Sequence, residues 1–350
     1  MKARSITYTL AALTVALAVE APVSVAQTRH QNAIIDLWNA GKPAFGVYAT
    51  TEGQPLPGQP NPAGQRGGRG QAPAQGQRGG PPNPEQIRQQ IAQLQQQLQQ
   101  LEAGGGRGQG GRGGGAQRPD LGYSKAVGEA LAKNPLYDFI FLNLEGNFTP
   151  EAVKNMSEGL RSAGASGRKT LVVRIPPIDV SGADKTKTIV KQAFDNGADA
   201  VTIPHVTSLE EAQQAISFFS AAVGTNNIWS PKNPGGEKLG MIMLEDPGAL
   251  MKVKEVADLP GFSIIACGIG SMGGAIRSTF GDGSQAMAGQ MAEAATLKVL
   301  EESKRVKIPN MLTANPEDVV RRVNQGFLAL LMSGPDADLA IKLGRLAASR

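Results

Sequence analysis

From residue 120 onward, the chain alternates short apolar runs with longer stretches in which apolar residues recur every three or four positions. The continuous hydrophobicity of the short runs is typical of strands buried on both faces. Their alternation with helical stretches predicts a parallel sheet with crossover helices. The runs are DFIFLNLE, TLVVRIP, AVTIPHV, LGMIMLE, FSIIACG, RVKIPNML and FLALLMS, and the helical stretches cover residues 150–163, 185–196, 208–222, 248–256, 283–304 and 316–325.

An eighth run, PAFGVYAT, lies before residue 51. Eight strands are the number that closes a (β/α)8 barrel, and about 250 residues is a typical length for that fold. The alternative is an open doubly wound sheet, which usually carries a glycine-rich phosphate turn after its first strand. The first run here is followed by ATTEGQPLPGQPNPAG, which is not such a turn, so the pattern favours an α/β TIM barrel.

Residues 51–119 are rich in Gly, Pro and Gln and poor in apolar residues. This composition predicts a disordered insertion between residues 27–50, which hold the first strand, and residues 120–350, the remainder of the barrel. Its seven arginines against three glutamates account for much of the formal net charge of +5. The tract GQRGGRGQ resembles RGG boxes that bind nucleic acid, but no aromatic residue is interleaved for base stacking, so no nucleic-acid partner is expected.

A short amphipathic helix is predicted at residues 85–102 inside the insertion. Apolar residues there alternate at spacings of four and three, as in the seam of a coiled coil. So short a seam is marginal in isolation, which leaves two alternatives: a helix paired with its own copy or with a groove on the barrel, or a transient helix. The seam residues are Ile87, Ile91, Leu94, Leu98 and Leu101.

Residues 1–26 have the pattern of a secretory signal peptide, with Lys2 and Arg4 before an apolar run and the small residues Ser24 and Ala26 at a cleavage site. The run is shorter than the roughly 20 apolar residues of a membrane span. We expect an exported protein, periplasmic or secreted, with no membrane span after cleavage; an uncleaved anchor is the alternative. The single Cys267 cannot form an internal disulfide and is expected to be a small buried residue.

Barrel enzymes carry their active sites at the C-terminal ends of the strands. A histidine at this edge can transfer protons near neutral pH, and a carboxylate is a suitable ligand for magnesium or manganese. The predicted ends present Asn143, Glu145, Arg174, His205, Glu245, Asp246, the loop CGIGSMGG, Asn310 and Thr313.

Five sequence motifs follow one another in an order that indicates a protein family. They are YDFIFLNLEG, LVVRIPP, DNGADAVTIPHV, GMIMLED and NPEDVVRRVNQGF. Together they resemble the HpcH/HpaI aldolase/citrate lyase family, the metal-dependent pyruvate aldolases, over nearly all of the chain from Gln31 except the insertion. The resemblance implies a TIM barrel and a carbon–carbon lyase that acts on a 2-keto acid through a metal-bound enolate.

The resemblance also implies roles for individual residues. Arg174 in VVRIPP matches the arginine that holds the substrate carboxylate or the developing enolate, and Glu245 in MLEDP matches the first metal ligand. Gly270 and Ser271 lie in the loop GIGSM, which matches a substrate-binding loop that also carries the second metal ligand. Asp246 is expected to point away or to cap the following helix.

Several positions depart from the family pattern. Ser271 replaces the aspartate that would be the second metal ligand, and Met243 replaces a glutamine. A divalent cofactor, Mg²⁺ or Mn²⁺, is therefore expected to bind with reduced affinity. Asn143 and Gly146 replace the acid and the histidine of the motif in which Glu145 is retained.

His205 is the candidate replacement for the missing histidine, as a catalytic acid or base. A structural, hydrogen-bonded histidine at the top of the barrel is the alternative. Two functions follow: a lyase that uses Arg174, Glu145 and His205 for catalysis, or an altered barrel that binds a small anionic ligand or a partner protein. A homo-oligomer is expected from the resemblance.

Overall fold

The computed structural model describes residues 30–51, 54–59, 122–164, 168–280 and 285–349. Its parallel strands form a closed barrel in which each strand pairs with the next along the chain and β8 pairs with β1. The predicted (β/α)8 barrel is confirmed. The strands are β1 (Ala44–Tyr48), β2 (Phe139–Asn143), β3 (Thr170–Arg174), β4 (Ala200–Val206), β5 (Leu239–Leu244), β6 (Ile264–Ala266), β7 (Asn310–Thr313) and β8 (Ala329–Met332).

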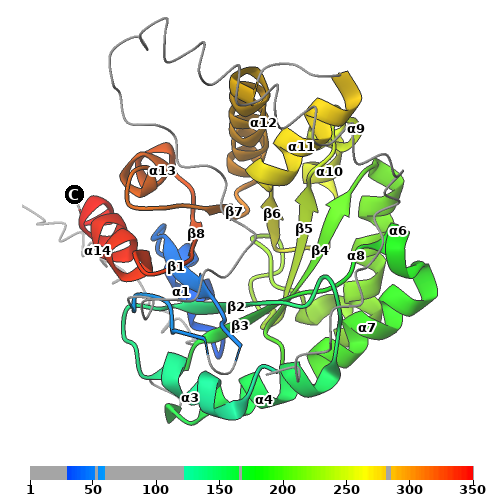
Figure 1. The fold of residues 1–350 in the computed structure, drawn as a ribbon. Coiled ribbons are helices and arrows are strands. Elements are labelled where there is room, and N and C mark those ends of the chain that lie inside the picture. Colours follow the sequence, from blue (N-terminus) through cyan, green and yellow to red (C-terminus); the bar gives the residue numbers. More distant parts are fainter. Residues whose placement is uncertain (1–29, 52–53, 60–121, 165–167, 281–284, 350) are drawn as a thin grey trace, which may run out of the picture.

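Helices surround the strands on the outside of the barrel (Figure 1). In the part of the chain that the structure describes, none of them has the length and apolarity to cross a membrane. The predicted signal peptide and the predicted helix at residues 85–102 lie outside the described residues. The helices are α1 (Ala33–Asn39), α3 (Lys125–Ala132), α4 (Pro150–Arg161), α6 (Ile178–Ser181), α7 (Ala183–Asp195), α8 (Leu209–Val223), the 3-10 helix η1 (Thr225–Asn227), α9 (Pro247–Leu250), α10 (Val253–Asp258), α11 (Ile269–Phe280), α12 (Gln285–Val306), α13 (Val319–Gln325) and α14 (Ala337–Ala348).

Three predicted segments differ from the structure. The helical stretch at residues 248–256 is divided between α9 and α10. The run RVKIPNML is not one strand, because α12 continues to Val306 and β7 begins only at Asn310, after a proline that has no amide hydrogen for the sheet. The prediction placed Asn310 at the C-terminal end of its strand, but Asn310 lies at the start of β7. The loop CGIGSMGG is largely helical, because Ile269 begins α11.

Alternation along the strands divides the core into two layers. Residues such as Phe139, Phe141 and Met241 fill the inside of the barrel, whereas their neighbours pack outward against the helices. Gly46 of β1 leaves space for the Phe139 ring, which a Cβ there would overlap. Because the interior is filled, a ligand can enter only at the strand ends.

The N-terminal end of the barrel is closed by α1. The Trp38 indole donates a hydrogen bond to the Leu328 carbonyl at 2.7 Å and contacts the Trp229 ring, with centroids 5.6 Å apart. Glu237 accepts backbone hydrogen bonds from Gln31 and Asn32, at the start of α1. The opposite end, where the strands terminate, remains as the accessible mouth.

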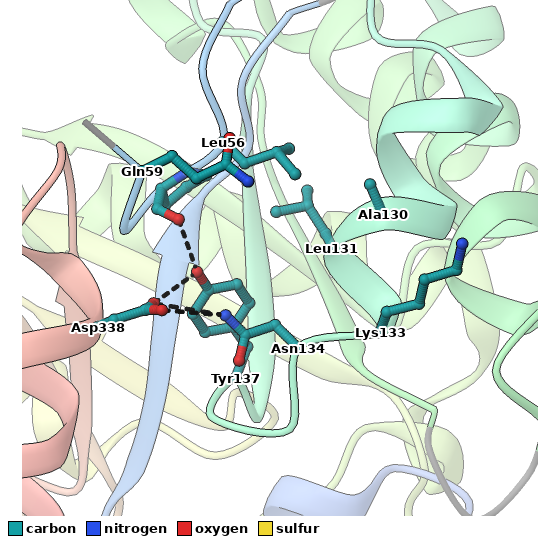
Figure 2. Close-up of a pocket in the computed structure, with 9 residues that line it drawn as sticks. Leu56, Gln59, Ala130, Leu131, Lys133, Asn134, Tyr137 and Asp338 are labelled. Atoms are coloured by element: carbon teal, nitrogen blue, oxygen red, sulfur yellow. Dashed lines mark hydrogen bonds between the residues drawn. The ribbon is translucent and has the colours of Figure 1, made fainter. Parts of the chain in front are cut away.

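The segment that follows β1 is anchored on the outer wall of the barrel. The Tyr137 hydroxyl lies 3.0 Å from the Pro57 carbonyl and 2.7 Å from the Asp338 carboxylate, which also accepts hydrogen bonds from the Asn134 amide (Figure 2). A cavity of about 260 Å³ lies beside these groups. The last described residues before position 60 therefore contact Tyr137, between α3 and β2, and Asp338 of α14.

Candidate active site

Four side chains from neighbouring strand ends meet at the mouth of the barrel. Arg174 ends β3, His205 lies near the end of β4, and Glu145 and Glu245 follow β2 and β5. Every member of this cluster contacts at least two of the others. The structure thus brings together the three predicted catalytic residues and the predicted metal ligand.

Arg174 is the central cation of the cluster. Like Thr170 and Val172, which precede it at alternate positions of β3, its side chain faces the inside of the barrel. Only 9% of its surface is exposed. Its Nη2 atom lies 2.9 Å from Glu145 Oε1 and 3.3 Å from Glu245 Oε2. The buried Nε atom has no hydrogen-bond partner among the described residues, so one donor of the guanidinium is left unsatisfied.

Glu245 is the most buried carboxylate at the mouth, with 3% of its surface exposed. Its Oε2 atom accepts a hydrogen bond from the His205 backbone amide at 3.2 Å. Gly268, just before α11, lies so close that a Cβ there would overlap Glu245 Oε1. Asp246 instead accepts a hydrogen bond from the Gly248 amide and caps α9, which confirms the predicted capping role.

Glu145 is directed at Arg174 by the backbone. The Leu144 amide donates to the Arg174 carbonyl at 2.9 Å, and the Glu145 amide donates to Asn143 Oδ1 at 3.3 Å. Of the two carboxylates in the cluster, Glu145 is the more accessible, with its side chain 27% exposed against 1% for Glu245. Glu145 is therefore the carboxylate that can be displaced from Arg174.

His205 and Glu145 form a hydrogen-bonded pair, with Nε2 2.8 Å from Oε1. This bond, together with the negative charges of Glu245 and Glu145, raises the pKa of His205 above its ordinary value against the opposing effects of burial and Arg174. Burial alone would raise the pKa of Glu145, but the bond from His205 and the charge of Arg174 outweigh it and lower that pKa. The pair therefore favours an imidazolium beside a carboxylate.

The second ring nitrogen of His205 supports the same protonation state. Nδ1 lies 3.3 Å from Glu245 Oε2, and a carboxylate can only accept a hydrogen bond. An imidazolium can donate to Glu145 and Glu245 at once, whereas a neutral ring can donate to only one of them. With one guanidinium facing two carboxylates, the cluster has the charge to hold this second cation.

The backbone at His205 is strained. Its φ angle is +53°, in the left-handed region that residues other than glycine rarely adopt. The position falls at a register shift between β4 and β5, between Ile203 and Val206. Strained conformations of this kind cluster at functional sites, and here the strain places the imidazole between Glu145 and Glu245.

Tyr48 is a residue of the mouth that the sequence reasoning missed. It ends β1, and its phenol lies in the electrostatic field of Arg174, Glu245 and Glu145. The signal was present, because Tyr48 occupies the same strand-end position in β1 that Arg174 occupies in β3.

The predicted loop residues Gly270 and Ser271 lie in the first turn of α11, beside the mouth. Gly270 is exposed, and a Cβ there would meet nothing within 4 Å. Ser271 is half-buried and has no recorded hydrogen bond to another described side chain. At the end of β7, Thr313 is exposed.

The side chains at the mouth do not fit a dedicated metal centre. Among the described residues, no three His, Cys, Asp or Glu side chains are arranged to hold a metal ion. Glu245 Oε2 already faces Arg174 and His205, and Ser271 offers a hydroxyl where the resemblance places a carboxylate. Magnesium requires a near-octahedral shell of oxygen ligands, which this donor set supplies only in small part.

Cys267 has no place in the reacting cluster. It is buried, and burial raises the pKa of its thiol to about 11, against the smaller effect of a hydrogen bond from Thr296. A thiol of this kind is protonated near neutral pH and is a poor nucleophile. The prediction of a buried, non-nucleophilic cysteine is confirmed.

Comparisons with known proteins give a structural similarity alone. No protein-family model and no curated protein sequence matches the chain. A HpcH/HpaI aldolase/citrate lyase family protein from Burkholderia cenocepacia J2315 is 18% identical, with 65% of this chain and 90% of that chain covered and a TM-score of 0.48. The HpcH/HpaI aldolase from Desulfitobacterium hafniense DCB-2 is 16% identical, with 65% and 88% covered and a TM-score of 0.48.

A third similar structure is the citrate lyase beta subunit from M. tuberculosis, complexed with oxaloacetate and magnesium. It is 16% identical, with 65% of this chain and 94% of that chain covered and a TM-score of 0.45. These proteins are of the kind that the sequence motifs resemble. Identities and TM-scores this low carry no argument about activity, so the function is argued from the side chains at the mouth.

Proposed function

We propose that the protein is a carbon–carbon lyase, aldolase-like, that cleaves or forms a 2-keto acid at the mouth of the barrel. The observation that carries the proposal is Arg174, a buried guanidinium with an unused Nε donor beside the hydrogen-bonded pair of Glu145 and His205. An arginine fork recognises a planar carboxylate, and an adjacent histidine can transfer protons.

Substrate binding requires a rearrangement of Glu145. The substrate carboxylate and Glu145 compete for the same guanidinium, and Glu145 is the accessible member of the two carboxylates. Displacement of Glu145 frees Arg174 for the substrate, and His205 keeps Glu245 as an acidic neighbour at Nδ1.

The residues divide the cleavage step between them. Cleavage uses the minor neutral form of His205, with the substrate C4 hydroxyl in the place of Glu145 at Nε2. This nitrogen takes the hydroxyl proton, the C3–C4 bond breaks, and its electron pair forms the C2–C3 double bond of an enolate with charge on the C2 oxygen. Arg174 stabilises this charge through its N–H groups, and protonation at C3 then gives the shorter keto acid. In the direction of synthesis, the imidazolium returns the proton.

The resemblance implies a divalent metal, which in such chemistry acts as a Lewis acid on the keto acid. Because the donor set at the mouth does not fit a dedicated metal centre, the steps assigned to Arg174, His205 and Glu145 do not involve one.

The test is pyruvate release from a panel of 4-hydroxy-2-oxo acids, followed with coupled lactate dehydrogenase, with and without Mg²⁺ or Mn²⁺. We expect Arg174→Lys to lower kcat/KM by roughly 100-fold, because the ammonium does not reproduce the fork. Lys252→Ala, which removes an exposed cation paired only with Glu255, should leave kcat/KM within about twofold. Absence of pyruvate release from every acid, with or without metal, contradicts the proposal.

The second candidate function is an altered barrel that binds a small anionic ligand without turnover. Gly146 in place of the motif histidine and the incomplete donor set favour it. Calorimetric binding of oxamate that is abolished by Arg174→Lys, in a protein without lyase activity, would support this alternative. A partner protein in place of a small anion would be indicated by the absence of oxamate binding together with a pull-down of a partner that depends on residues 52–118.

A further inference from the structure

The structure places one phenol at the mouth that the proposed reaction has not used. Tyr48 is the last residue of β1. Like Ala44 and Gly46, at alternate positions of the same strand, it faces the inside of the barrel. It packs against the inner apolar cluster, whereas its neighbour Val47 belongs to the outer one. Tyr48 therefore points into the barrel at the end where the substrate would bind.

The ring of Tyr48 is held in place from one side. It meets the buried Phe141 ring edge-on, with centroids 5.1 Å apart and an interplanar angle of 69°. Edge-to-face contacts of this geometry are favourable. Because Phe141 fixes the ring, the hydroxyl has little freedom to leave the mouth.

The hydroxyl lies within the electrostatic field of the charged cluster. Burial raises the pKa of Tyr48, the charge of Arg174 lowers it, and Glu245 and Glu145 raise it further. The phenol is thus a neutral O–H group near neutral pH, able to donate one hydrogen bond. No hydrogen bond joins this hydroxyl to another of the residues that the structure describes, so the donor is available to a ligand.

We infer that the Tyr48 hydroxyl donates a hydrogen bond to the oxygen of the bound 2-keto acid on which negative charge develops. The inference rests on the proposed function, and it assigns to β1 a second donor that acts opposite Arg174. No proton is transferred in this role, because Tyr48 stabilises the enolate oxygen while His205 holds the proton. Two donors at one developing oxyanion follow the general arrangement of sites that stabilise such charge.

The test compares Tyr48→Phe with Tyr123→Phe. The first substitution removes the hydroxyl and keeps the ring contact with Phe141, so the fold should persist, as circular dichroism and thermal denaturation would show. Tyr123 is a matched control: its hydroxyl lies 3.4 Å from the Asn143 carbonyl at the same end of the barrel, and its burial raises its pKa as well.

We expect Tyr48→Phe to lower kcat by roughly 10- to 100-fold with KM nearly unchanged, and Tyr123→Phe to keep kcat within about twofold. Unchanged kcat in Tyr48→Phe overturns the inference and leaves the lyase proposal standing.

A second readout separates the inference from the lyase proposal. Pyruvate or oxamate added to the wild-type protein should perturb the ultraviolet absorbance of tyrosine, and Tyr48→Phe, but not Tyr123→Phe, should abolish this change. If the wild-type protein lacks lyase activity but shows this pattern, Tyr48 contacts the ligand and the lyase proposal fails. If calorimetry shows that neither pyruvate nor oxamate binds, both are overturned.

Discussion

Nε2 of His205 lies 2.8 Å from Oε1 of Glu145, although the two residues are 60 positions apart in the chain. The resemblance implies a histidine at position 146, where this chain has Gly146. The proposed base, His205, comes instead from β4, and its acidic neighbour Glu145 follows β2.

Substitution of Glu145 by Gln should lower the pKa of His205 toward its ordinary value. The hydrogen bond from Glu145 is the largest cause of the raised pKa, and an amide removes the negative charge that favours the imidazolium. Proton NMR titration with a chelator present would measure this pKa, because the chain has only two histidines. His30 serves as the internal control, and an unchanged His205 pKa would contradict the predicted coupling.

Substitution of Gly268 by Ala should disrupt the site. The added Cβ overlaps Glu245 Oε1, so Glu245 or α11 must move, with a loss of about 1–3 kcal/mol in the free energy of unfolding and weaker oxamate binding. Gly289→Ala, on α12, is the matched control, because its Cβ would meet nothing within 4 Å. Denaturant unfolding and calorimetry would measure the two effects, and equal behaviour of both variants would refute the steric argument.

Substitution of Ser271 by Asp should create affinity for a divalent ion beside Glu245. A second carboxylate raises the negative charge and the number of hard oxygen ligands, so calorimetry should show Mn²⁺ binding at least about tenfold tighter than in the wild-type protein. Ser278→Asp, the same change at an exposed position of α11, should leave Mn²⁺ affinity near the wild-type value. Equal affinities of the two variants would argue against a role for position 271.

Glu293 should stabilise the fold in a pH-dependent manner. Its carboxylate accepts hydrogen bonds from buried Arg322 at 2.6 and 2.7 Å, and these bonds, with the charges of Arg322 and Arg321, lower the pKa of Glu293 despite its burial. A carboxyl whose pKa is lowered by folding stabilises the folded state fully at pH values above its ordinary pKa of 4.5. This stabilisation is lost as the pH falls through the lowered pKa.

Glu293→Gln should therefore reduce the free energy of unfolding by roughly 2 kcal/mol near neutral pH, with a difference from wild type that shrinks in acid. Glu301→Gln, at an exposed ion pair with Lys298 on the same helix, should change it by less than about 1 kcal/mol. Urea unfolding at several pH values would measure both, and a constant difference for Glu293→Gln would exclude the ion pair as its cause.

Much of the fold was predictable because strand and helix periods are local properties of the chain. The runs around β2, β3, β4 and β5 were found nearly to the residue. The errors arose where local signals conflict: Pro309 lies inside an apolar run and delays β7 to Asn310, and the glycines of CGIGSMGG masked α11. Helix α11 forms despite its glycines because Met272 and Ile276 are buried against the barrel.

The sequence by itself determined most of the residues that stand at strand ends, because the end of an apolar run needs no tertiary information; Asn310, at the start of β7, was the exception. Arg174, Glu145, His205 and Glu245 were all identified in this way. Only the tertiary structure decided that the four share hydrogen bonds, that Glu145 is more exposed than Glu245, and that Tyr48 lies in their electrostatic field. The physical reason is that closure of the barrel sets the stagger between strands, and this stagger, which no local pattern contains, fixes which side chains meet.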